Sequence, residues 1–175
     1  ILRIRGDAMQ NSVPTGEGGM LAVLGTSIED IEKIIEENKN EIFVEIANDN
    51  SVGQIVLSGN NNDLEKLSII LKNKRIKNVK LPVSAPFHCS LMNKATDIMK
   101  EELSKLQFKK GSNVLISNIT ADEIFNAEEL KNLLIKQIEN RVRWRESVNN
   151  MIKREVNKFI EIGPGKVLSG LVKRI

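Results

Sequence analysis

The chain has 175 residues, of which 41% are hydrophobic and 28% charged, and this supports one ordinary hydrophobic core or two small ones. Lysine and arginine number 26 against 23 for aspartate and glutamate, a mild excess that permits an acidic partner without requiring one. A single cysteine and a single histidine exclude an internal disulfide framework and a cysteine- or histidine-rich metal site, so we expect no metal and a reduced compartment, cytoplasmic or organellar. No apolar run approaches the ~20 residues of a membrane-spanning helix, so we expect no membrane association.

The first 83 residues predict a small layered domain. Its predicted elements are, in chain order, the last turns of a helix over 1–12, a strand over 20–24, a helix after Ser27, strands over 41–47 and 54–58, a helix capped by Asn61 or Asn62, and a strand over 79–83. Residues 48–53 read as a hairpin turn, and Pro82 favours an edge position for the last strand because proline cannot donate to a ladder. The order βαββαβ is typical of a ferredoxin-like fold.

The pattern changes after residue 83. The predicted elements are helices near 91–106, 127–138 and 145–155, strands over 114–118 and 159–162, and a final helix from Lys166. Helices that alternate with isolated strands indicate an α/β architecture with parallel pairing. We therefore divide the chain into the end of a helix (1–13), a ferredoxin-like small domain (14–83) and a larger α/β part (84–175).

His88 lies where a predicted strand ends and a helix begins, the position at which α/β proteins often place their sites. A helix N-terminus disfavours imidazolium and leaves a ring nitrogen able to accept a proton, which suits a general base. Without a surrounding motif, a surface or capping histidine is the more common interpretation.

Two further features suggest chemistry only superficially. Cys89 adjoins the histidine, but adjacent side chains usually point in different directions, so we interpret it as a small buried thiol. Residues 163–166 (GPGK) lack the spacing of a phosphate-binding loop and read as a tight turn. Recognition of RNA by a ferredoxin-like sheet requires aromatic residues, and with no tyrosine and 3% aromatics we expect no nucleic-acid partner.

Five segments, in this order and spacing, resemble the malonyl-CoA:acyl-carrier-protein transacylases. They are residues 5–10 (RGDAMQ), 18–20 (GGM), 48–59 (NDNSVGQIVLSG), 84–92 (SAPFHCSLM) and 161–168 (EIGPGKVL). The resemblance implies a ferredoxin-like small domain joined to the C-terminal part of an α/β-hydrolase-like acyltransferase large domain. It also implies transfer of malonyl from coenzyme A, as a thioester substrate, to the phosphopantetheine thiol of acyl carrier protein in fatty acid biosynthesis, with no bound cofactor, by an enzyme that is a monomer when complete.

The resemblance also assigns roles to residues. His88 matches the catalytic base, and Arg5 matches the arginine that holds the malonyl carboxylate, a task suited to its planar fork. The main-chain carbonyl that orients the histidine is assigned to Arg143, and Phe87 is assigned to exclusion of branched acyl groups. Further family positions that serve either structure or ligand contact are Asn48, Asn50, Gln54 and Asn118.

One family motif, the segment with the nucleophilic serine, has no match in this sequence. The family nucleophile is a serine in a G-x-S-x-G segment, and no serine among these 175 residues stands in that pattern. We therefore expect the chain to be the C-terminal part of the enzyme, inactive alone. Two hypotheses follow: the chain belongs to a complete transacylase, or it is a non-catalytic remnant that at most binds acyl carrier protein.

Overall fold

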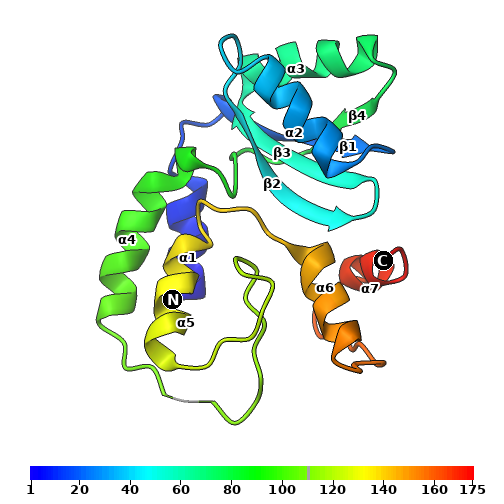
Figure 1. The fold of residues 1–175 in the computed structure, drawn as a ribbon. Coiled ribbons are helices and arrows are strands. Elements are labelled where there is room, and N and C mark those ends of the chain that lie inside the picture. Colours follow the sequence, from blue (N-terminus) through cyan, green and yellow to red (C-terminus); the bar gives the residue numbers. More distant parts are fainter. Residues whose placement is uncertain (110) are drawn as a thin grey trace.

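A computed structural model describes residues 1–109 and 111–175 (Figure 1). Its elements in chain order are α1 (Leu2–Gln10), β1 (Gly18–Leu24), α2 (Ile28–Glu37), β2 (Val44–Ser51), β3 (Gln54–Asn60), α3 (Asn61–Asn73), β4 (Lys77–Lys80), a 3₁₀ turn (Ser90–Met92), α4 (Asn93–Ser104), α5 (Ala127–Lys136), α6 (Trp144–Lys153) and α7 (Val167–Val172).

The small domain is a four-stranded antiparallel sheet in the order β2-β3-β1-β4, with α2 and α3 on one face (Figure 1). This is the predicted ferredoxin-like βαββαβ fold. Leucine, isoleucine and valine side chains of the sheet and both helices form the core between the two layers. Ser27 caps α2 as predicted, and its hydroxyl accepts a hydrogen bond from the amide of Asp30 at 3.1 Å. The cap of α3 is Asn60, one residue before the predicted choices.

The β2–β3 hairpin is longer than predicted. Its strands continue through the asparagine-rich segment to Ser51 and resume at Gln54, so the turn contains only Val52 and Gly53. Gly53 has φ +70°, which suits a tight two-residue turn. Pairing with β3, together with the hydrogen bond from the amide of Asp49 to the carbonyl of Val142 at 2.9 Å, satisfies backbone groups of residues 48–51, and this outweighs the turn preference of asparagine and aspartate.

The last strand of the small domain lies at the edge of the sheet, as predicted, but it ends before Pro82. Its edge position follows from pairing with β1 alone. The amide of Leu81 still donates to the carbonyl of Met20 at 2.9 Å. This hydrogen bond keeps the chain next to β1 where it continues from β4 into the segment that carries His88.

The other helices lie on the opposite side of the sheet from α2 and α3 (Figure 1). α1 packs against α4, and α4 against α5, around a core that includes Met9, Met92, Met99 and Ile138. α6 and α7 contact β2. In the part of the chain that the structure describes, no helix is long and apolar enough to cross a bilayer.

The two strands predicted in the second half are not formed. Among residues 1–109 and 111–175, segments 114–118 and 159–162 join no sheet, and the first has only an isolated bridge between Ile116 and Glu123. A strand exists only where a neighbour pairs with its backbone groups, and the predicted parallel partners are not present in these residues. Ile160 and Ile162 are consequently 71% and 94% exposed.

Candidate active site

His88 lies on the segment between β4 and the 3₁₀ turn. Its backbone has φ +60°, a left-handed conformation that non-glycine residues rarely adopt and that clusters at functional sites. The segment lies close to β1, because a Cβ on Gly18 would come within 2.5 Å of the ring of Pro86. Glycine at this position therefore allows the segment to approach the sheet.

The imidazole of His88 is oriented by a main-chain carbonyl. Nδ1 lies 2.9 Å from the carbonyl oxygen of Gln137. A carbonyl can only accept, so Nδ1 carries the proton and Nε2 is left with a free lone pair. This tautomer is the one in which Nε2 can accept a proton from a nucleophile.

The carbonyl predicted for this task, that of Arg143, is the wrong one. Arg143 is the N-cap of α6, and its carbonyl accepts from the amide and the hydroxyl of Ser147 in the first turn. Gln137 follows the last residue of α5, where carbonyl groups lack partners within the helix and can accept from a side chain. A main-chain acceptor carries no side-chain signal, so the sequence could not single out Gln137.

Burial lowers the pKa of His88 below its ordinary value. The hydrogen bond to Gln137 raises the pKa, and the positive charge of Arg5 lowers it further. The net direction is downward, so the imidazole is neutral at pH 7. A neutral, oriented imidazole can act as a general base.

Arg5 lies on α1, in the first half of the helix, and is half-buried. Burial lowers the pKa of its guanidinium, and no carboxylate among the described residues opposes that shift. A half-buried guanidinium without a carboxylate partner retains donors for an anionic ligand.

A cavity of about 590 Å³ joins these two groups. Its lining includes five predicted site residues, which are Arg5, Asn48, Asn50, Phe87 and His88. Sequence reasoning missed the remaining lining residues, which are Gly6, Met9, Gln10, Met20, Val56 and Leu81. Most of these are apolar residues that the sequence could not distinguish from core.

Irregular pairing in β2 explains why Asn48 reaches the cavity. The β2–β3 register shifts between Ile46 and Asn48, so that Asn48 pairs with Val56, which lines the same cavity. Strict alternation would place Asn48 on the face of Ile46, which packs against the helices. The shift is the kind of β-bulge that redirects side chains beside active sites.

Gln54 and Asn118 are not among the residues that line this cavity. Gln54 begins β3, and its side-chain oxygen accepts from Arg174 at 2.8 Å. The carbonyl of Asn118 accepts from the amide of Arg143 at 3.0 Å. The structure thus gives both residues structural contacts.

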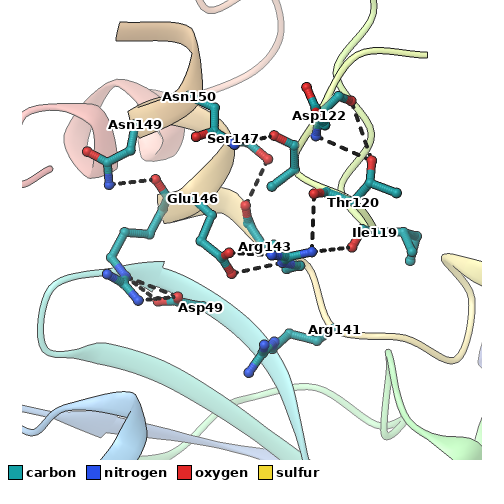
Figure 2. A network of polar contacts seen from close by, with 12 residues as sticks. Asp49, Ile119, Thr120, Asp122, Arg141, Arg143, Glu146, Ser147, Asn149 and Asn150 are labelled. Atoms are coloured by element: carbon teal, nitrogen blue, oxygen red, sulfur yellow. Dashed lines mark hydrogen bonds and ion pairs between the residues drawn. The ribbon is translucent and has the colours of Figure 1, made fainter. Parts of the chain in front are cut away.

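A polar network connects the small domain to α6 (Figure 2). The carboxylate of Asp49, 2% exposed, accepts from Nε of Arg145 at 3.0 Å and from its Nη2 at 2.9 Å. Arg143 pairs with Glu146, and its Nη1 donates to the carbonyls of Ile119 and Thr120 at 3.2 and 3.1 Å (Figure 2). The Arg143 side chain therefore has a structural role.

Cys89, beside the histidine, is buried, and its thiol donates to the carbonyl of Pro86 at 3.0 Å. Burial raises the pKa of Cys89 to about 12. The thiol is therefore protonated at neutral pH and is a poor nucleophile. The structure supports the interpretation of Cys89 as a packing residue.

Comparison with known proteins shows which proteins the chain is similar to. No family model matches the chain. It is 42% identical over 176 residues to the malonyl CoA-acyl carrier protein transacylase of Bacillus subtilis, and 36% identical over 176 residues to that of Escherichia coli. These matches cover 99% and 100% of the chain, which spans only 56% and 57% of the two relatives.

Solved structures that match the chain are of the same kind of protein as these sequence relatives. The crystal structure of malonyl CoA-acyl carrier protein transacylase from Clostridium perfringens matches with a TM-score of 0.96 at 41% identity, over 99% of this chain and 55% of that one. A complex of a type II PKS acyl-carrier protein with its malonyl-transacylase matches with a TM-score of 0.93 at 34% identity, over 99% and 57% of the respective chains.

Proposed function

Since the chain is homologous along its whole length to part of the malonyl CoA-acyl carrier protein transacylases, we propose that it carries the general base and the carboxylate-binding arginine of a malonyl transferase. The substrates of the proposed reaction are malonyl-CoA and acyl carrier protein. One observation carries the proposal: a neutral, oriented imidazole and a half-buried guanidinium line the same cavity.

The proposed chemistry has two transfers. Nε2 of His88 takes the proton of a nucleophilic hydroxyl as its oxygen attacks the malonyl thioester carbonyl, and it returns the proton to the departing coenzyme A thiolate. The phosphopantetheine thiol of acyl carrier protein then attacks the acyl-enzyme ester by the same steps in reverse. We propose that the hydroxyl is a serine in a part of the protein outside these 175 residues.

Arg5 and Phe87 would select the acyl group. A guanidinium can form two parallel hydrogen bonds with the free carboxylate of malonyl, which acetyl does not have. Phe87 lies in the cavity lining beside His88. We propose that its ring restricts the space available for a branched acyl group.

The test is an assay of the complete protein, that is, this chain with the coding sequence that precedes it. We expect malonyl transfer from malonyl-CoA to the phosphopantetheine form of acyl carrier protein. His88→Ala should slow transfer by about 10²–10⁴-fold, the scale of general-base catalysis. Absence of turnover in the complete protein, with acyl carrier protein still bound, would contradict the proposal and support a remnant that only binds its partner.

A further inference from the structure

Two side chains of the small sheet hold the backbone on either side of His88. The hydroxyl of Ser58, on β3, donates to the carbonyl of Phe87 at 2.5 Å. One carboxylate oxygen of Glu45, on β2, accepts from the amide of Ser90 at 2.8 Å and from its hydroxyl at 2.5 Å. The residue before the histidine and the second residue after it are thus both tied to the sheet.

These two ties originate at one point of the sheet. Glu45 and Ser58 are directly opposite in the antiparallel β2–β3 register, so their side chains leave the same face. Their neighbours Val44 and Leu57 belong to the core under α2 and α3, so Glu45 and Ser58 face the other way, toward the His88 segment. Ser58 is fully buried, and its hydroxyl has no access to water as an alternative partner.

The geometry of His88 depends on such support. A left-handed backbone at a non-glycine residue persists only where its surroundings determine it. The hydrogen bond from Nδ1 of His88 to the carbonyl of Gln137 joins residues 49 positions apart in the sequence. It therefore forms only if the segment that carries His88 is fixed at the correct distance from Gln137.

We propose that Glu45 and Ser58 are positioning residues for His88, and that this cross-strand pair fixes the backbone from which the imidazole reaches Gln137 and presents Nε2 to the cavity. The proposal rests on the proposed function for its catalytic meaning. The placement of the ring, however, can be measured without any acyl transfer.

The measurement is an NMR titration of the His88 imidazole in the full-length protein with labelled histidine. His88 is the only histidine in these 175 residues, and a His88→Gln spectrum identifies its signal in any longer form. The charged groups that line the two cavities beside the ring are Arg5, Glu32, Glu36, Glu45, Glu139 and Arg141, and the positive charge of Arg5 lowers the imidazole pKa.

Ser58→Ala changes no charge and removes one tie. Its matched control in the same domain is Ser68→Ala, which removes the hydrogen bond that the hydroxyl of Ser68, on α3, donates to the side-chain oxygen of Asn78, on β4, at 2.6 Å. We expect the His88 pKa to rise toward its ordinary value in Ser58→Ala, because the ring loses its buried position, and to stay unchanged in Ser68→Ala. Nitrogen chemical shifts should show the Nδ1–H tautomer in the control and a tautomer mixture in Ser58→Ala.

The Glu45 variants separate charge from hydrogen bonding. Glu45→Gln removes the charge but keeps an oxygen acceptor for Ser90, whereas Glu45→Ala removes both. Both variants lose the carboxylate charge, so any effect of that charge on the histidine pKa is the same in the two. Release of the segment, which exposes the ring to water, raises the histidine pKa in Glu45→Ala. We therefore expect Glu45→Ala to titrate at a higher pH than Glu45→Gln.

If Ser58→Ala titrates like Ser68→Ala, and Glu45→Ala like Glu45→Gln, with unchanged tautomers in folded proteins, the positioning role is wrong. In the complete transacylase, Ser58→Ala and Glu45→Ala should lower kcat by up to about 10²-fold, the effect of misplacing a reacting group by about 1 Å. A wild-type protein without transfer activity would contradict the proposed function, while the imidazole titration would still decide the positioning role.

Discussion

The neutral state of His88 makes the folded protein sensitive to acid. Its pKa in the folded state is depressed, chiefly by burial, so between the ordinary histidine pKa of about 6.5 and the folded value the unfolded chain binds more protons. This contribution to stability is therefore complete above pH 6.5 and is lost as the pH falls through the lower folded-state pKa.

We predict that His88→Gln, which cannot titrate, loses less stability than wild type between pH 7.5 and 5.5. Thermal unfolding of both proteins at each pH measures the difference. Carboxylates whose pKa is lowered in the folded state, such as Glu146 and Asp63, act nearer pH 4.5 and are shared by both proteins. Equal losses of stability in the two proteins would show that the pKa of the His88 imidazole is not lowered in the folded state.

Cys89 should be chemically silent in the folded protein. With a thiol pKa of about 12 and no access to solvent, it should react with a thiol reagent at pH 8 only after denaturant is added. Cys89→Ala in the complete enzyme should leave transfer almost unchanged. A Cys89→Ala enzyme that is folded but as slow as His88→Ala would assign the thiol to the chemistry.

Arg5 should determine which acyl group is accepted. In the complete enzyme, Arg5→Ala should lose roughly 2–5 kcal/mol of malonyl transition-state binding, the scale for removing one partner of a buried charge pair. Acetyl has no carboxylate, so its transfer should be unchanged or faster. Arg5→Lys should recover only part, because an ammonium lacks the bidentate fork. A malonyl-to-acetyl ratio of kcat/KM that is constant across the three proteins would contradict this role.

At the scale of elements, the contact between β2 and α6 depends on one buried carboxylate. Arg145→Met would leave Asp49, 2% exposed, without its partner, and removing one partner of a buried pair costs about 3–5 kcal/mol. Because Arg145 is 29% exposed, we predict the lower end of this range, measured by urea unfolding. Arg141→Met is the control, since its pair with Glu32 is half-exposed and should contribute about 0–1 kcal/mol. Similar losses in both variants would show that the buried pair has no special weight.

The accuracy of the sequence prediction follows the location of each element's partners. The small domain was predicted correctly because its strands and helices pair within residues 18–80, where local periodicity and caps such as Ser27 determine the result. The errors there concern boundaries, as at Asn60 and Ser51, where strand pairing and capping geometry decided. Segments 114–118 and 159–162 have strand-like sequences, but a strand also needs a neighbour that sequence periodicity does not supply.

The site shows the same division. His88 stood out by its place between a predicted strand and a predicted helix, and the family resemblance added Arg5, Phe87, Asn48 and Asn50. The structure brings all five to one cavity. The carbonyl of Gln137 and the ties from Glu45 and Ser58 depend on the path of the backbone in space. A main-chain acceptor or a cross-strand register has no signature in the residue types that create it.

At the scale of the whole molecule, the two halves differ in how well their apolar residues are covered. The small-domain core is closed, whereas Ile160, Ile162 and Val167 near the C-terminus are 71%, 94% and 70% exposed. Val114, in segment 114–118, and Phe125, shortly before α5, are 69% and 71% exposed. Gathered exposed apolar side chains are typical of a surface that packs against another part of a protein.

We predict that, in the complete protein of the proposed function, residues outside these 175 cover these segments and pair with their backbone. Amide hydrogen exchange should therefore be fast in 114–118 and 159–162 when these 175 residues are expressed alone, because their amides lack strand partners, and slow in the complete protein. Residues 54–60 of β3, a central strand in the sheet order, are the internal control and should be protected in both forms. Since the proposed nucleophile lies outside these residues, the chain alone should also show no transfer activity. Equal exchange of the two segments in both proteins would mean that they are surface loops, and would overturn their assignment as strands that need an outside partner.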